Sequence, residues 1–217
     1  MQDDSVVKLS VDFPWKSDAH PMMGGLVVRY NRGNVVDVGC GTCQIYHHLK
    51  GAGWTGKYVG VDVTSYEKQA YPQEVRLMFG DALELDLPRS DTYILYDVLE
   101  HVEKPVELLA KCLTRAQNVL IAVPKRNEDL WKSGFVEYHQ LDKTHKHWGF
   151  TEQEVRHLVE RSGGRILQYK ELIPTDLLTV LGAFSQSLTL ARVVQKLMKV
   201  FPTKIYHQEL WCEVSLA

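Results

Sequence analysis

Short apolar runs, rich in β-branched residues, alternate along the chain with amphipathic segments. The segments 43–52 and 105–115 carry apolar residues three and four positions apart, which is typical of helices that pack on a sheet. This alternation predicts βαβ units and a mostly parallel sheet covered on both faces. The runs that we predict as strands are residues 34–40, 57–63, 75–80, 92–98 and 118–123.

The last third of the chain begins with the clearest helix, residues 151–162. Thr151 and Glu154 have the spacing of a capping box, and Gly163-Gly164 provides a stop. We predict two further strands, at residues 165–172 and 205–216, which bring the total to seven. The apolar stretch between them, residues 176–201, is predicted to be helical and is longer than a simple connection requires.

A glycine-containing turn follows the first strand, in Asp37-Val38-Gly39-Cys40-Gly41. Glycines remove the Cβ atoms that would keep a ligand away from the backbone, and the start of the next helix offers free N–H groups. The turn is therefore suited to a nucleoside-like ligand.

Two acidic residues stand where the next two strands end. Asp62 comes 21 residues after Gly41, where a carboxylate can accept hydrogen bonds from ribose hydroxyls. Asp81 follows the third strand, in Phe79-Gly80-Asp81-Ala82, and is placed to bind the exocyclic amine of an adenine. Each residue alone is also compatible with a plain turn, a solvated carboxylate or a helix cap. Their order favours one crevice at the carboxyl ends of the strands.

These motifs, together with Asp97-Val98-Leu99-Glu100-His101-Val102 and the stretch 142–152, resemble those of class I S-adenosylmethionine-dependent methyltransferases of the small-molecule type. The resemblance covers about residues 30 to 172. It implies an α/β fold, with a Rossmann-like, doubly wound, mostly parallel seven-stranded sheet, helices on both faces and an antiparallel last strand.

The same resemblance implies S-adenosyl-L-methionine as the cofactor. Gly39 and Gly41 would lie under its methionine part, Asp62 would hold the ribose, and Asp81 with Ala82 would hold the adenine. The segment 97–99 would border the methionine and the acceptor. Cys43 stands where many relatives have a third glycine. The cofactor-binding residues predicted in this way are Asp37, Gly39, Gly41, Asp62, Asp81, Ala82, Asp97 and Val98.

Methyl transfer is an in-line displacement, so the protein mainly has to align the acceptor with the breaking bond. A hydroxyl or ammonium acceptor also needs a base, and histidine is the usual one near neutral pH. We take His101 as the first candidate and His139 and His145 as the others, although His101 could equally be satisfied locally at a helix start. We predict no metal site, because the histidines at 139, 145 and 147 are expected to line a pocket or the surface.

The cysteine pair Cys40 and Cys43 has a C-x-x-C spacing, but no second such pair exists to complete a four-thiolate zinc site. The formal net charge of −2 provides no overall attraction to nucleic acid, and no basic stripe appears. We therefore expect no nucleic-acid partner, and we predict a small-molecule or lipid-linked acceptor.

We predict a single domain over residues 1–217. Within it we distinguish an N-terminal lid or brace (1–33), a cofactor-binding core (34–123), an acceptor-side insertion (124–150) and a helical insertion before the last strand (173–204). The helical insertion is compatible with core packing, a homodimer face, an apolar acceptor pocket or peripheral membrane contact. Its uncharged part is shorter than the roughly 20 residues that a transmembrane helix needs.

The acidic start of the sequence lacks the pattern of a secretory signal, so we expect a cytoplasmic protein. Two other functions remain open at this point. An NAD-dependent oxidoreductase shares the strand, glycine turn and acid, but it usually has G-x-G-x-x-G, and the third glycine is missing here. A non-catalytic module that binds S-adenosylmethionine would carry the same cofactor residues.

Overall fold

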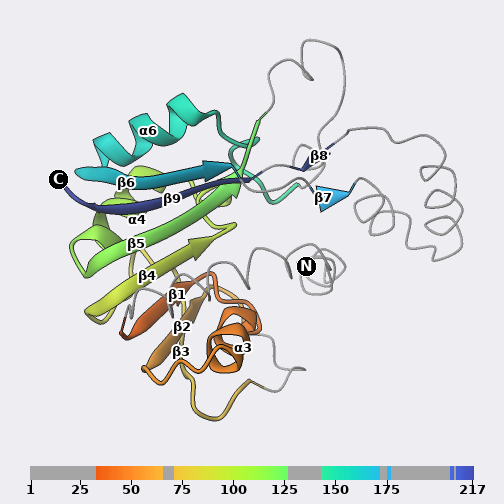
Figure 1. The fold of residues 1–217 in the computed structure, drawn as a ribbon, viewed down its shortest axis with the longest axis vertical. Helices are drawn as coiled ribbons and strands as arrows, with labels where there is room; N and C mark the ends of the chain where they lie inside the picture. The colour runs from red at the N-terminus through yellow and green to blue at the C-terminus, as the bar shows by residue number, and fades with distance from the viewer. Residues whose placement is uncertain (1–32, 66–70, 127–142, 172–174, 177–205, 208) are drawn as a thin grey trace, which may run out of the picture.

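The computed structural model describes residues 33–65, 71–126, 143–171, 175–176, 206–207 and 209–217. Seven strands form one sheet in the order β3-β2-β1-β4-β5-β9-β6 (Figure 1). The strands are β1 (Val35–Val38), β2 (Tyr58–Asp62), β3 (Arg76–Phe79), β4 (Ser90–Tyr96), β5 (Ala116–Pro124), β6 (Gly164–Glu171) and β9 (Glu209–Leu216).

The first five strands are parallel, so their carboxyl ends lie at one edge of the sheet. The register aligns these ends closely: Val38 of β1 is opposite Val61 of β2 and Leu95 of β4. Asp62, the last residue of β2, is opposite Phe79 of β3. Strand order reverses next to β1, from which the chain goes to β2 on one side and, later, to β4 on the other. Open α/β sheets bind ligands at such a switch point.

Helices cover both faces of the sheet. Helix α3 (Gln44–Gly51) packs on one face, and α4 (Pro105–Leu113) and α6 (Glu152–Arg161) pack on the other (Figure 1). The central strands are buried on both sides, as adjacent residues of β4 show: Tyr93 belongs to the core under α4 and α6, and Ile94 to the core under α3. This arrangement explains why the strands appear in the sequence as nearly continuous apolar runs.

The predicted fold class is confirmed, including the antiparallel last strand, because β9 lies antiparallel between β5 and β6. The final strand predicted at 205–216 is divided in the structure. Its first part, β8 (Tyr206–His207), pairs instead with β7 (Thr175–Asp176) in a separate two-stranded sheet. Helix α6 begins after Thr151, and both hydrogen bonds of the predicted capping box are present.

Several predictions fall on segments outside the described residues. These are nearly all of the N-terminal lid or brace, nearly all of the 173–204 insertion, and His139. None of the helices in the described part of the chain has the length and apolar character that a membrane-spanning helix needs.

Candidate functional site

The glycine turn after β1 has the backbone conformation that the sequence suggests. Gly39 (φ 72°) and Gly41 (φ 51°) are both left-handed, a region that side chains disfavour. A Cβ atom on Gly39 would lie 2.5 Å from Cγ2 of Val98, so the turn packs directly on the loop after β4. A Cβ atom on Gly41 would have no described atom within 4 Å, which leaves space beside the backbone for a ligand.

Cys43, at the position of the missing third glycine, is itself left-handed, with φ 63°. It is the N-cap of α3 and makes no side-chain capping hydrogen bond. The conformation typical of a glycine is therefore kept by a small, fully buried side chain. A hydrogen bond with Cys43, together with burial, raises the pKa of the Cys40 thiol. Because thiolates are what bind zinc and react, this supports a structural role for the pair.

Asp62 joins the glycine turn to the end of β2. One carboxylate oxygen accepts a hydrogen bond from the Gly41 amide at 2.8 Å, and the other accepts one from the Thr64 amide at 2.9 Å. The amide of Gly80, just after β3, donates to the Asp62 carbonyl at 2.9 Å. A carboxylate offers about four acceptor positions, so two backbone bonds leave its chemistry compatible with ribose hydroxyls.

Asp81 and Ala82 follow directly on the Gly80 contact, so the structure places them beside the end of β2. The Asp81 carboxylate accepts a hydrogen bond from the Leu83 amide at 2.8 Å and thereby shapes a turn. Asp81 is exposed and Ala82 is buried. The Asp81 carboxylate therefore has the local capping role that the sequence allows, and it stays exposed next to the carboxyl end of β3.

Asp37 lies within β1, with its residue only 2% exposed, and it accepts a hydrogen bond from the Tyr58 hydroxyl. Burial, followed by the negative charge of Asp37, raises the pKa of Tyr58 well above its ordinary value. The Asp37 carboxylate therefore has a partner inside the sheet, and its predicted contact with the cofactor stays a prediction.

The loop after β4 begins with a second unusual backbone. Asp97 has φ 49°, and Asp97 and Cys43 are the two non-glycine residues with positive φ in the described segments. Both lie at the carboxyl edge of the sheet, where such strain is commonly associated with function. Val98, in contact with Gly39, then leads to His101, whose amide donates to the Val98 carbonyl at 3.0 Å.

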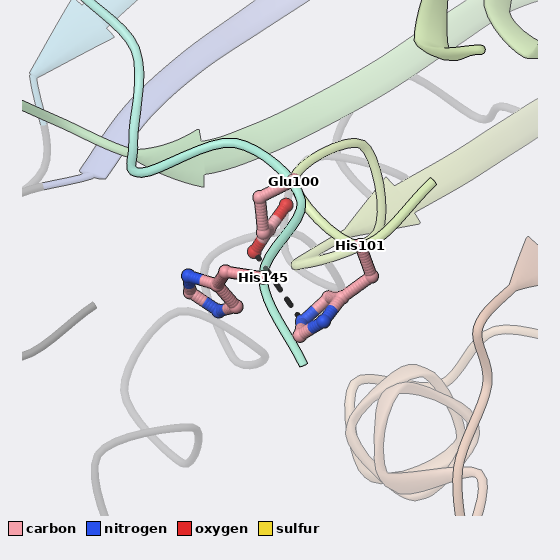
Figure 2. A group of neighbouring side chains, drawn as sticks. All are labelled: Glu100, His101 and His145. Carbon is pink, nitrogen blue, oxygen red and sulfur yellow. Dashed lines mark ion pairs between the residues drawn. The ribbon is translucent and has the colours of Figure 1, made fainter. Parts of the chain in front are cut away.

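Three side chains that can donate electron pairs meet beside this loop: Glu100, His101 and His145. Figure 2 shows that Glu100 and His101 come from the loop after β4, and His145 from the segment that passes it. Oε1 of Glu100 lies 3.9 Å from Nε2 of His101, and the two imidazole rings are 4.5 Å apart between centroids, at 83°. Glu100 is fully buried, whereas both histidines are partly exposed. We call these three residues the Glu-His-His cluster.

Backbone hydrogen bonds hold the two loops of the cluster together. The Glu100 carbonyl accepts from the amides of Lys146 at 2.7 Å and His147 at 3.0 Å. Nε2 of His147 lies 3.1 Å from the Val102 carbonyl, so this ring faces the backbone rather than the cluster. At its far end, the segment is held to β5 by the Phe150 amide, which donates to Pro124 at 2.8 Å. These hydrogen bonds fix the backbone of both segments that carry the cluster.

The structure thus brings together two of the three predicted histidines, His101 and His145, and it adds residues that the sequence analysis did not select. In the sequence, Glu100 stands out only as part of the motif at 97–102, and no pattern marks Thr144, whose hydroxyl lies 3.0 Å from Nδ1 of His101. The useful signal was the adjacent Glu-His pair directly after a buried strand. The histidine set considered for a metal, at 139, 145 and 147, differs from the one that the fold assembles.

Comparison with known proteins supports this arrangement. Residues 24–169 match the profile of a family described as a methyltransferase domain, which is most of the chain. A search of curated protein sequences finds no match.

Several solved structures share the fold. A cyclopropane synthase from Mycobacterium tuberculosis is 12% identical, with a TM-score of 0.64, and the match covers 99% of this chain and 95% of that protein. Magnesium protoporphyrin IX methyltransferase from Synechocystis, solved with bound S-adenosylhomocysteine, is 18% identical, with a TM-score of 0.56 and coverages of 91% and 84%. The [4+2]-cyclase SpnF is 13% identical, with a TM-score of 0.60 and coverages of 91% and 81%.

At these identities the solved structures establish the fold, and the matched family identifies the chain. The glycine turn, Asp62, Asp81 and the loop after β4 follow one another along the chain as predicted, and all lie at the carboxyl edge of the parallel strands. The chain belongs to the methyltransferase-domain family and is a class I S-adenosylmethionine-dependent methyltransferase.

Proposed function

We propose that the protein transfers the methyl group of S-adenosyl-L-methionine to a small-molecule or lipid-linked metabolite that gives up a proton. One observation carries this proposal: Gly39 and Val98 lie in contact, so the turn suited to the cofactor abuts the loop that bears Glu100 and His101. Cofactor and acceptor chemistry would then meet at the carboxyl ends of β1 and β4.

The residues on the cofactor side fit an adenosyl ligand. No described atom lies within 4 Å of a Cβ atom built on Gly41, and Asp62 presents a carboxylate already oriented by two amides. We assign the ribose to Asp62, the adenine to Asp81 and Ala82, and the methionine part to Gly39 with the segment 97–98. When bound, S-adenosylmethionine supplies a methyl carbon that becomes bonded to the acceptor, while the carbon–sulfur bond breaks and its electron pair stays on sulfur.

On the acceptor side, His101 and His145 are the proposed groups that handle the acceptor's proton. They are partly exposed, and Thr144 orients the His101 ring from one nitrogen, as an effective base requires. His139 stays a predicted alternative. The S-adenosylhomocysteine in the Synechocystis enzyme supports the cofactor assignment, since that molecule is what remains of S-adenosylmethionine after methyl transfer.

The decisive experiment is calorimetric titration of the protein with S-adenosylhomocysteine and, separately, with NADH. We expect binding of the first and none of the second. Binding of NADH alone would establish the oxidoreductase alternative and overturn the proposal. A methyl-transfer assay over small metabolites and lipids would then distinguish an enzyme from a non-catalytic binding module, for which no acceptor would turn over.

A further inference from the structure

We propose that the Glu-His-His cluster binds one divalent transition-metal ion, which holds the oxygen of a hydroxyl acceptor next to the cofactor crevice. The part concerning the ion stands on the geometry of the cluster. The part concerning the acceptor rests on the proposed function.

The donor atoms of the cluster already converge. One ligand atom from each of Glu100, His101 and His145 lies within 4.8 Å of the other two. Atoms that share a zinc ion at about 2.0 to 2.2 Å lie roughly 3 to 4 Å apart from one another, so small side-chain rotations would complete the set. The Oε1 to Nε2 distance of 3.9 Å between Glu100 and His101 already falls within that span.

Hydrogen bonds from neighbouring groups orient the side chains of the cluster, as is usual for metal ligands. A metal-bound histidine commonly has its second ring nitrogen held by a hydrogen-bonding partner. Nδ1 of His101 lies 3.0 Å from the Thr144 hydroxyl, while Nε2 of the same ring faces Glu100. Because the amides of Lys146 and His147 bind the Glu100 carbonyl, the loop that carries His145 is fixed relative to Glu100.

The donor types indicate which ion would bind. Two imidazoles and one carboxylate suit zinc, iron(II) or manganese better than calcium or magnesium, which prefer oxygen ligands alone. Three protein ligands leave at least one position for an outside ligand. A hydroxyl bound there would release its proton to solvent more readily, because the ion stabilises the resulting oxygen anion. With the ion bound, His101 and His145 would therefore act on the acceptor's proton through the ion and not as bases themselves. The transferred methyl would then go to oxygen.

The test is a titration of chelator-treated full-length protein with Zn²⁺ alone, and with Co²⁺ followed by its visible absorption spectrum. We expect one ion per chain and a Co²⁺ spectrum that differs from that of the hydrated ion. His101→Gln and His145→Gln should each weaken binding by at least roughly tenfold. His157→Gln, which removes an exposed histidine of α6, serves as the matched control and should leave affinity unchanged.

A second pair of variants tests the orienting hydroxyl. Thr144→Val should weaken Zn²⁺ binding roughly tenfold, as loss of an outer hydrogen bond typically does, and Thr144→Ser should restore it. Thermal unfolding of every variant shows that the fold is retained. The proposal is overturned if the wild type binds Zn²⁺ no better than a His101→Gln/His145→Gln double variant. That result would say nothing against S-adenosylhomocysteine binding. Conversely, if S-adenosylhomocysteine did not bind, the Zn²⁺ titration would still decide whether the cluster binds an ion.

Discussion

At the amino-terminal edge of the parallel strands, polar groups of neighbouring loops bind one another, whereas the carboxyl edge carries the residues that we assign to the cofactor and the acceptor. The amino edge contains Asp91, which accepts from the Asn34 amide at 2.7 Å, and Trp54, which donates to the Gly33 carbonyl at 2.8 Å. The side chain of Asn34 in turn accepts from the Lys57 amide at 2.9 Å. These bonds close the edge.

The carboxyl edge uses similar residue types with different results. Asp62 also binds two N–H groups, but it does so beside Gly41, where a Cβ atom would have no described atom within 4 Å. Left-handed backbone at Cys43 and Asp97 and the buried carboxylate of Glu100 are further features of this edge. Asp62 and Asp91 each accept two hydrogen bonds, so these bonds alone do not tell a binding residue from a structural one. The backbone around each carboxylate makes the distinction.

The largest expected effect comes from exchanging one carboxylate at each edge. Asp62→Asn should weaken S-adenosylhomocysteine binding by roughly 10- to 100-fold, because a neutral amide accepts more weakly and on one atom only. Asp91→Asn changes a carboxylate that also accepts two hydrogen bonds, from Asn34 and Gln117, and should leave that affinity unchanged. Calorimetric titration measures both. Equal losses in the two variants would contradict the distinction between the edges.

A pair of glycines provides the next test. Gly41→Ala and Gly53→Ala each place a side chain at positive φ, with no described atom within 4 Å of the new Cβ atom. Both should lose about 1 kcal/mol of unfolding free energy, the usual cost of left-handed backbone. Only Gly41→Ala should also weaken S-adenosylhomocysteine binding, by roughly tenfold if the new methyl group occupies ligand space. Unchanged binding by this variant would remove Gly41 from the cofactor site.

The third test breaks the closed edge. Trp54→Phe removes the indole N–H that donates to Gly33 while keeping an aromatic ring in the core. The free energy of unfolding, measured with urea, should fall by about 1 kcal/mol, the typical net value of one hydrogen bond. Affinity for S-adenosylhomocysteine should not change. A clear loss of affinity would mean that the two edges are coupled.

The smallest expected effect concerns pH and the start of α6. Although burial alone would raise it, hydrogen bonds from Thr151 and Arg126 lower the pKa of Glu154 below its usual 4.5. Because this pKa is lower in the folded state, the carboxylate stabilises the fold above about pH 4.5 and ceases to do so as pH falls through the folded value.

Glu154→Gln should therefore lower the free energy of unfolding at pH 7 by roughly 0.2 to 1 kcal/mol, as expected of a half-exposed ion pair. The difference from the wild type should disappear in acid. Unfolding curves at several pH values measure this, and a difference that persists below the folded pKa would show that the effect is not one of charge.

The central parallel strands could be predicted because strands buried on both faces leave nearly continuous apolar runs between turns. The positions of Asp62 and Asp81 at strand ends could be predicted from the same runs, while their roles toward the cofactor stay predictions. The division of the last predicted strand could not. Residues 206–207 continue the apolar pattern of β9, and their pairing with Thr175–Asp176 depends on the tertiary fold.

The Glu-His-His cluster shows the same limit more sharply. Glu100 and His145 are 45 positions apart, and nothing in their local sequence reveals that amides of 146 and 147 bind the Glu100 carbonyl. A glutamate after a strand also reads as a solvated charge, whereas this one is fully buried. The partner of Asp37 could not be predicted either. Its carboxylate accepts a hydrogen bond from Tyr58 on the neighbouring strand β2, and the sequence does not show which strands are neighbours.

The position of β9 has a consequence for how the chain folds during synthesis. β9 contributes the hydrogen bonds to both β5 and β6, although it is the last in chain order of the seven strands of this sheet. Until the ribosome has released residues 209–216, β5 has an unpaired edge and β6 has no neighbour in the sheet. The parallel strands β1 to β5, which carry the predicted cofactor residues, can form early. The sheet is complete only when β9 inserts between β5 and β6, which are synthesised before it.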